Sequence, residues 1–296
     1  LAILLFGAGG PLLRRAGGDD ESLGYLVMAL VAGIVIGAGM LVATTTAPRG
    51  VSRAARPRRG LRDGYAEGFA ALRRSRAFRD LLAAFVLQGL ATGVMLAGAN
   101  YVAVRVLESE DALTLLFLAL IGPAVVCAPL WGRLARRVGK ERGFALASVL
   151  FAVAAASLVG MLWAPGPWVY APVALAGAAY AGMQSLPMAM LPDVISHDAR
   201  EHGDGRAGSF GGIWTAGETA GMALGATLLT IVLAVTGYVE SIGSADVAQP
   251  PAAIAGIVVS FSLLPAALVL GSLVPLARYP LRRADVDADV ATEVRR

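Results

Sequence analysis

Charged side chains are scarce in this chain. Asp, Glu, Lys and Arg make up 16% of its 296 residues, whereas an average soluble domain has about a quarter. Apolar residues make up 57%. This balance excludes an ordinary soluble domain and indicates a membrane protein. The 36 glycines fit that class, because tightly packed spanning helices favour small residues at their contacts.

Cysteine and histidine are rarer still. The single cysteine, Cys127, excludes an intrachain disulfide framework, and no zinc-ligand spacing involves it. Both histidines, His197 and His202, lie in "SHDAREHGDGRAGSF" among acids and arginines. They are five residues apart and would diverge by about 140° on a helix. We therefore expect no metal site there. No nucleophile is placed with a base either, so an enzyme is the least favoured class, and we expect neither a cofactor nor a nucleic-acid partner.

Long apolar runs dominate what remains. Seven are long enough to cross a bilayer, which needs about 20 apolar residues: Leu23 to Ala43, Leu81 to Leu107, Leu113 to Trp131, Phe144 to Trp163, Trp168 to Leu191, Phe210 to Thr236 and Ala252 to Leu276. Each is predicted to be helical, because lipid offers no partner for backbone amides. A shorter run begins at Leu1. We interpret it as the tail of a helix from a longer protein.

The basic residues predict which connections face the cytoplasm, since segments rich in Lys and Arg stay on that side. They gather on alternate connections, with groups between Arg49 and Arg79, between Arg133 and Arg142, at Arg200 and Arg206, and after Arg278. The intervening connections Ala164 to Pro167 and Gly237 to Pro251 carry none. We therefore expect a multi-pass protein of the cell membrane, with the long basic connection and the C-terminus in the cytoplasm.

The long basic connection predicts a second feature. Leu61, Tyr65, Phe69 and Leu72 recur at helical spacing between arginines, which is typical of an amphipathic helix on an anionic membrane surface. A solvated loop with accidental periodicity is the alternative. One span precedes this connection and six follow it, the plan of a two-halved secondary transporter. The predicted domains are a remnant of an N-terminal bundle (1–47), a basic linker (48–79), a six-helix bundle (80–277) and a cytoplasmic tail (278–296).

Two stretches resemble a known family. "GRLARRVGKERG", Gly132 to Gly143, is similar to the short cytoplasmic loop of the major facilitator superfamily, except that Arg136 stands where an acid is usual. A positively charged loop that only sets topology is the alternative. "LPDVISHDAREHGDGRAGSFGGIWTAGETAGMALGA" with the later "GY" resembles the glycoside-pentoside-hexuronide:cation symporters, the melibiose permease branch of that superfamily. The matching residues of the penultimate loop are Asp193, Gly203, Arg206 and Gly208.

The resemblance implies an all-α membrane fold with the superfamily's C-terminal six-helix bundle plus the last one to two helices of its N-terminal bundle. It also implies cation-coupled symport of a sugar, a glycoside or a related small solute by alternating access, by a monomer in the lipid bilayer. The coupling cation, sodium or proton, stays open, because the family's cation-binding carboxylates lie on earlier helices. The alternatives are a lipid or amphiphile transporter of the same fold and a non-transporting scaffold or receptor. The resemblance assigns a cytoplasmic gate to Arg133, Arg136, Arg137, Lys140, Asp193 and Arg206.

Candidate binding residues come from polarity inside the spans, where ionisable groups are costly. Glu218 is the one acid deep in a span, about eleven residues from its cytoplasmic end, so it is predicted to bind substrate, a proton or a cation. A protonated carboxyl bonded to a neighbouring helix is the alternative. Relatives commonly carry a lysine at the position of Thr219, so their coupling chemistry does not transfer directly. The remaining candidates are Trp214, Thr215, Asn100, Tyr101, Gln88 and Gln184, with Trp214 a possible surface for a sugar ring.

Overall fold

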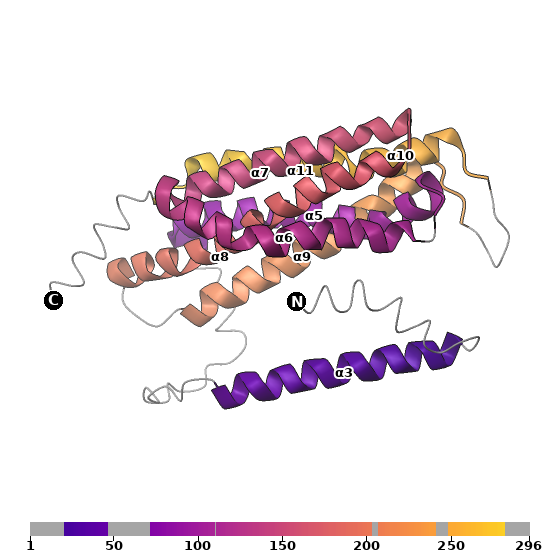
Figure 1. Cartoon of the computed structure of the whole chain (residues 1–296). Helices are drawn as coiled ribbons and strands as arrows, with labels where there is room; N and C mark the ends of the chain where they lie inside the picture. The colour runs from indigo at the N-terminus through magenta and orange to yellow at the C-terminus, as the bar shows by residue number, and fades with distance from the viewer. Residues whose placement is uncertain (1–20, 47–71, 110, 203–206, 241–247, 282–296) are drawn as a thin grey trace. The chain divides into compact units, whose positions relative to one another are not determined.

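The computed structural model describes residues 21–46, 72–109, 111–202, 207–240 and 248–281. Every regular element within these ranges is a helix (Figure 1). The chain divides into two compact units, Leu1–Leu61 and Arg62–Arg296. Six helices are long and apolar enough to cross a membrane, as judged by length and composition. The predicted all-α membrane fold is confirmed.

The first unit contributes one described helix, α3 (Glu21–Thr46). Most of its apolar side chains are exposed; Ile34 and Leu41, for example, are 69% and 68% exposed. A helix that is apolar all round needs lipid or other helices around it, so α3 fits a membrane span. The predicted helix tail at the start of the chain lies outside the described residues.

The second unit is a bundle of long helices. They are α5 (Arg76–Tyr101), α6 (Ala112–Val138), α7 (Lys140–Ser157), α8 (Tyr170–His202), α9 (Ala207–Val235), α10 (Pro251–Phe261) and α11 (Leu263–Arg278). Helix α5 packs against α9 and α11, α8 packs against α6 and α7, and α11 also packs against α7. Figure 1 shows these helices running side by side in the bundle.

Helix α8 differs from the other predicted spans. It forms over 33 residues but is not among the six helices that meet the apolarity criterion. Its sequence contains Tyr180, Gln184 and two internal prolines, Pro187 and Pro192. Because α8 packs against both α6 and α7, it meets protein along much of its length and has less need of the apolarity that lipid demands.

Three predicted spans change helical type or break. The run that begins in α5 ends in a π-helix, η1 (Val102–Val106), and α7 continues into a 3₁₀ helix, η2 (Leu158–Leu162). The last run is two helices, because Ser262 has φ −120° and ψ −78°, outside the helical region. Pro265 explains the break, since a proline cannot donate to the carbonyl four residues earlier and its ring clashes with it. The Ser262 hydroxyl donates to Val258 O at 2.6 Å instead.

Glycines allow α5 and α9 to approach until their main chains touch. A Cβ added to Gly93 on α5 would lie 2.9 Å from Met222 Cα, and one added to Gly221 on α9 would lie 2.8 Å from Val86 O. Small residues at a helix contact permit this spacing in membranes. The main-chain oxygen of Glu218 consequently lies directly beside α5, at Gly89.

Two predictions fall wholly or largely on residues that the structure does not describe. The stripe predicted as an amphipathic surface helix lies there except for Leu72, and so does the loop that carries Arg206.

Candidate functional site

A narrow cavity lies between α5, α8 and α9, inside the bundle. Its volume is about 10 Å³, roughly the space of one water molecule. It is lined by Phe85, Gln88, Gly89, Thr92, Tyr180, Met183, Gln184, Glu218 and Met222. Three residues predicted from the sequence, Gln88, Gln184 and Glu218, thus meet at one place although three different helices carry them. We call this space the interior cavity.

Gln88 is the most buried polar residue of the interior cavity, 3% exposed. Its side-chain nitrogen donates to Ser148 Oγ on α7 at 2.8 Å and to Ser272 Oγ on α11 at 3.0 Å. Its Oε1 is buried and has no hydrogen-bond partner. Gln88 therefore ties three helices together by its nitrogen and leaves a buried acceptor unsatisfied.

On the opposite wall, Gln184 Nε2 donates to Tyr180 Oη at 2.7 Å, one turn earlier on α8. Thr92 Oγ1 donates to its own helix, at Gln88 O, over 2.9 Å. Glu218 is partly buried. Its position eleven residues after the first residue of α9 corresponds to about 16 Å along the helix, near the middle of a hydrocarbon layer about 30 Å thick.

The other predicted binding residues lie away from the interior cavity. Trp214 is 1% exposed and stacks on Phe85, with ring centroids 4.3 Å apart and an interplanar angle of 20°. One face of the indole that could meet a sugar ring is thus covered in this structure. Tyr101 packs edge-on against Tyr238, 5.3 Å between centroids. Exposed positions are occupied by Thr215, Thr219 and Asn100.

A second, larger cavity of about 510 Å³ lies where α6 ends, α7 begins and α11 is followed by Tyr279. Its charged and phenolic lining residues, which we call the gate cluster, are Arg136, Lys140, Glu141, Asp193 and Tyr279. Lys140 Nζ donates to Asp193 Oδ2 at 2.6 Å and to Ala189 O at 3.0 Å. The structure therefore pairs two of the predicted gate residues and places a third in the same cavity. Two further predicted gate residues on α6 are exposed, namely Arg133 and Arg137.

Tyr279 is the buried member of the gate cluster, 3% exposed. Burial raises the pKa of its hydroxyl above the usual value, and the carboxylates of Asp193 and then Glu141 raise this pKa further. Its phenol therefore stays protonated at neutral pH and can donate a hydrogen bond in the cavity.

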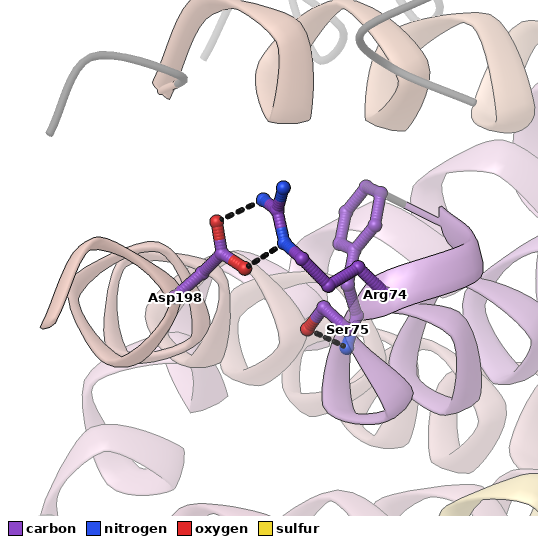
Figure 2. A network of polar contacts seen from close by, with 4 residues as sticks. Arg74, Ser75 and Asp198 are labelled. Carbon is purple, nitrogen blue, oxygen red and sulfur yellow. Dashed lines mark hydrogen bonds and ion pairs between the residues drawn. The ribbon is translucent and has the colours of Figure 1, made fainter. Parts of the chain in front are cut away.

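A second ion pair involves Asp198, close to the C-terminal end of α8. Arg74 donates to Asp198 through Nε at 3.1 Å to Oδ1 and through Nη2 at 2.6 Å to Oδ2. Figure 2 shows the fork of the guanidinium facing both carboxylate oxygens. Ser75, the next residue, caps α5 by accepting from Phe78 N at 3.2 Å. The segment entering α5 is thus tied to the last turns of α8.

The histidine stretch is helical up to His202, the last residue of α8. His197 Nε2 lies 3.5 Å from Glu201 Oε1, one turn further along the helix. Among the described residues there is no group of three His, Cys, Asp or Glu side chains that could hold a metal ion. The described part of this stretch forms the last turns of α8 and the first turn of α9.

Comparison with known proteins identifies the family. The sequence profile of the family described as "MFS/sugar transport protein" matches residues 1–283. The chain belongs to this family. The family predicted from the two loop stretches is thereby confirmed.

One relative is an uncharacterized symporter of Synechocystis. The two are 31% identical over 180 residues, which is 60% of this chain and 32% of the relative. The chain thus spans about a third of the length of the curated relative that it matches.

Sequence reasoning missed several residues of these sites. Ser148 and Ser272 stand alone in apolar runs, and buried serines usually bond only their own helix, so nothing marked them as partners of Gln88. Asp198 is one of several acids in the histidine stretch, and nothing there marks it as the partner of Arg74. Arg74 was one arginine among many in the linker, and Tyr279 carried no motif.

Proposed function

We propose that this protein is a secondary active transporter that moves a sugar, a glycoside or a related small solute together with a cation. This chain contributes a C-terminal six-helix bundle over residues 80–277. The basic linker, 48–79, joins that bundle to residues 1–47, which belong to an N-terminal bundle. The linker and the tail face the cytoplasm of a cell whose membrane the protein crosses. Alternating access moves the two bundles about a site near the membrane midplane.

One observation supports this most: Gln88, Gln184 and Glu218 line one cavity inside the bundle. Ionisable groups in spanning helices are costly and mark solute or ion pathways. The two ion pairs near the C-terminal end of α8, Lys140 with Asp193 and Arg74 with Asp198, support alternating access. Such pairs can hold one conformation closed and separate in the other.

Uptake into proteoliposomes tests the proposal. The full-length protein, reconstituted with an inward sodium or proton gradient, is expected to accumulate one or more labelled sugars or glycosides. Glu218→Gln keeps the side-chain shape but removes the charge. It should lower uptake by at least about tenfold, the effect of losing one hydrogen bond to a charged group. Glu240→Gln, the same change at an exposed position, is the matched control.

The alternatives give different results in the same assay. Transport of amphiphiles without any sugar would indicate a lipid or drug transporter of the same fold. An absence of flux for every compound would indicate a scaffold or receptor. Uptake and pH dependence that are unchanged by Glu218→Gln would remove Glu218 from the site.

A further inference from the structure

We propose that an acidic segment of this chain, residues 284–293, docks into the larger cavity beside the end of α6 and binds the guanidinium of Arg136 there. We call this space, of about 510 Å³, the gate cavity. A docked segment would hold the ends of α6, α7 and α8 together. The proposal concerns a contact within the chain and needs no transport step, so it is independent of the proposed function.

The chain stays on the wall of the gate cavity after α11 ends. At Tyr279 the backbone leaves the helix, with φ −60° and ψ 120°. Tyr279 and Leu281 are 3% and 8% exposed, and both line the gate cavity. Asp285 follows Leu281 by four residues, which span at most about 14 Å. The acidic segment therefore begins within reach of the cavity.

The gate cavity has a basic side chain that other described residues do not neutralise. Arg136 lines the cavity and is exposed, and it has no hydrogen-bond or ion-pair partner among the described residues. Arg133 is also exposed and lies three residues earlier on α6, which places it beside Arg136 on the same side of the helix. The end of α6 thus presents positive charge to a partner.

The acids of the gate cavity are already engaged elsewhere. Asp193 accepts from Lys140 Nζ at 2.6 Å. Glu141 is in the first turn of α7 and lies back over Gly139, since a Cβ added there would be 2.9 Å from Glu141 Oε2. The start of a helix carries partial positive charge, which stabilises a carboxylate at that place. Neither acid is therefore available to Arg136, and an acidic partner from outside the described residues fits the cavity.

The segment 284–293 has the matching charge and the matching apolar groups. It contains four acids and neither Lys nor Arg; the acids are Asp285, Asp287, Asp289 and Glu293. Valine or alanine alternates with aspartate from residue 285 to 290, so an extended chain would carry acids on one side and apolar groups on the other. Much of the remaining cavity lining is apolar. Arg282 and Arg283, which precede the segment, have the same charge as Arg136 and do not compete for it.

The volume of the gate cavity suits this occupant. Cavities of about 300–1,000 Å³ hold a small organic ligand, so about 510 Å³ has room for several side chains of the segment. The short connection also favours docking, because a segment tethered by a few residues has an effective concentration of about millimolar near its site.

Disulfide cross-linking of the full-length protein tests the contact. In a Cys127→Ala background, Ala288→Cys is combined with Ala189→Cys, which is exposed and lines the gate cavity. The control combines Ala288→Cys with Met188→Cys, the neighbouring position on α8, which is 50% exposed and does not line the cavity. Under mild oxidation in phosphatidylcholine nanodiscs, the Ala189 pair should form its disulfide several-fold faster than the Met188 pair, as measured by mass spectrometry of peptides.

The dependence on charge separates docking from mere proximity, because an undocked tethered segment also meets the cavity at times. Arg136→Glu should slow the cross-link several-fold, and so should a higher ionic strength, which screens exposed charges. Replacing the three aspartates as well, with Asp285→Lys, Asp287→Lys and Asp289→Lys, should restore the rate in Arg136→Glu. Such rescue requires a folded protein, so it also controls for damage by the single variant.

Three results would overturn the proposal. They are equal rates for the Ala189 and Met188 pairs, a rate that Arg136→Glu leaves unchanged, and loss of the cross-link when phosphatidylglycerol is added to the nanodiscs. The last result would assign Arg136 to an anionic lipid headgroup. Cross-linking in a protein that transports nothing would support the docking and contradict the proposed function. Sugar uptake without the charge-dependent cross-link would do the reverse.

Discussion

Two aspartates near the end of α8, Asp193 and Asp198, differ in how they are paired. Asp198 is 3% exposed and meets the guanidinium of Arg74 with both oxygens. Asp193 meets Lys140, whose side chain is 38% exposed. A bidentate pair with a buried carboxylate loses more when it is broken than a half-exposed lysine pair does, because the charge left behind is poorly solvated. Asp198 is therefore the stronger structural anchor of the two.

Asp198→Asn should lower the free energy of unfolding by about 2–3 kcal/mol, somewhat less than for a fully buried pair because Arg74 keeps some contact with solvent. Thermal unfolding of the full-length protein in detergent measures the change, with Glu240→Gln as the exposed control. The double variant Arg74→Gln with Asp198→Asn should lose less than the sum of the two single variants. Equal stability of Asp198→Asn and the parent would show that the pair contributes nothing.

At the scale of the element, α5 holds the bundle together through two different surfaces. One is the glycine surface, where Gly89 and Gly93 touch the main chain of α9. The other is the Gln88 amide, which reaches α7 and α11. Close main-chain contact and a buried polar link are the two main ways that helices associate in lipid, where burial of apolar surface gives little drive. Helix α5 thus positions the walls of the interior cavity.

Gly93→Ala should destabilise the protein by about 1–3 kcal/mol or more, because the new methyl group would overlap Met222 and force α5 and α9 apart. Gly122→Ala on α6 is the matched control, since nothing lies within 4 Å of its added Cβ. Thermal unfolding compares the two, and a loss of Glu218-dependent uptake in Gly93→Ala would accompany the shift of α9. Equal stability of both alanine variants would contradict the close packing of α5 and α9.

For the whole molecule, charge and apolar length together define a multi-pass membrane protein. Six described helices have the length and composition of spans. The basic residues concentrate on alternate connections, including those that hold Arg74 and Lys140. Because segments rich in Lys and Arg stay in the cytoplasm, we propose that all the connections rich in basic residues lie on the cytoplasmic side.

Labelling of intact cells tests this sidedness. In a Cys127→Ala background, a cysteine in place of Glu240 should react with a membrane-impermeant maleimide. One in place of Arg137 should react only after the cells are permeabilised. Both positions are exposed in the structure, so accessibility within the protein does not separate them. Equal labelling of both in intact cells would overturn the proposed orientation.

The local sequence was enough to predict the helices and the family. Apolar runs predict spans because lipid forces each backbone to satisfy its own amides, and the loop around Asp193 carries the family pattern in contiguous residues. The sequence also marked Gln88, Gln184 and Glu218, since polar groups are conspicuous in an apolar span. It did not indicate the changes of helical type at η1 and η2, because these depend on individual hydrogen bonds, whereas the break at Ser262 follows from Pro265.

What only the tertiary structure decided is which of these residues meet. Gln88 is 60 residues from Ser148 and 184 residues from Ser272 along the chain. Arg74 is 124 residues from Asp198. No local pattern encodes such pairs, because each depends on which faces of the helices pack together. The amino-acid sequence by itself determined that helices cross a membrane. The packing of α5 against α8 and α9 decided that Gln88, Gln184 and Glu218 line one water-sized space, because each comes from a different helix.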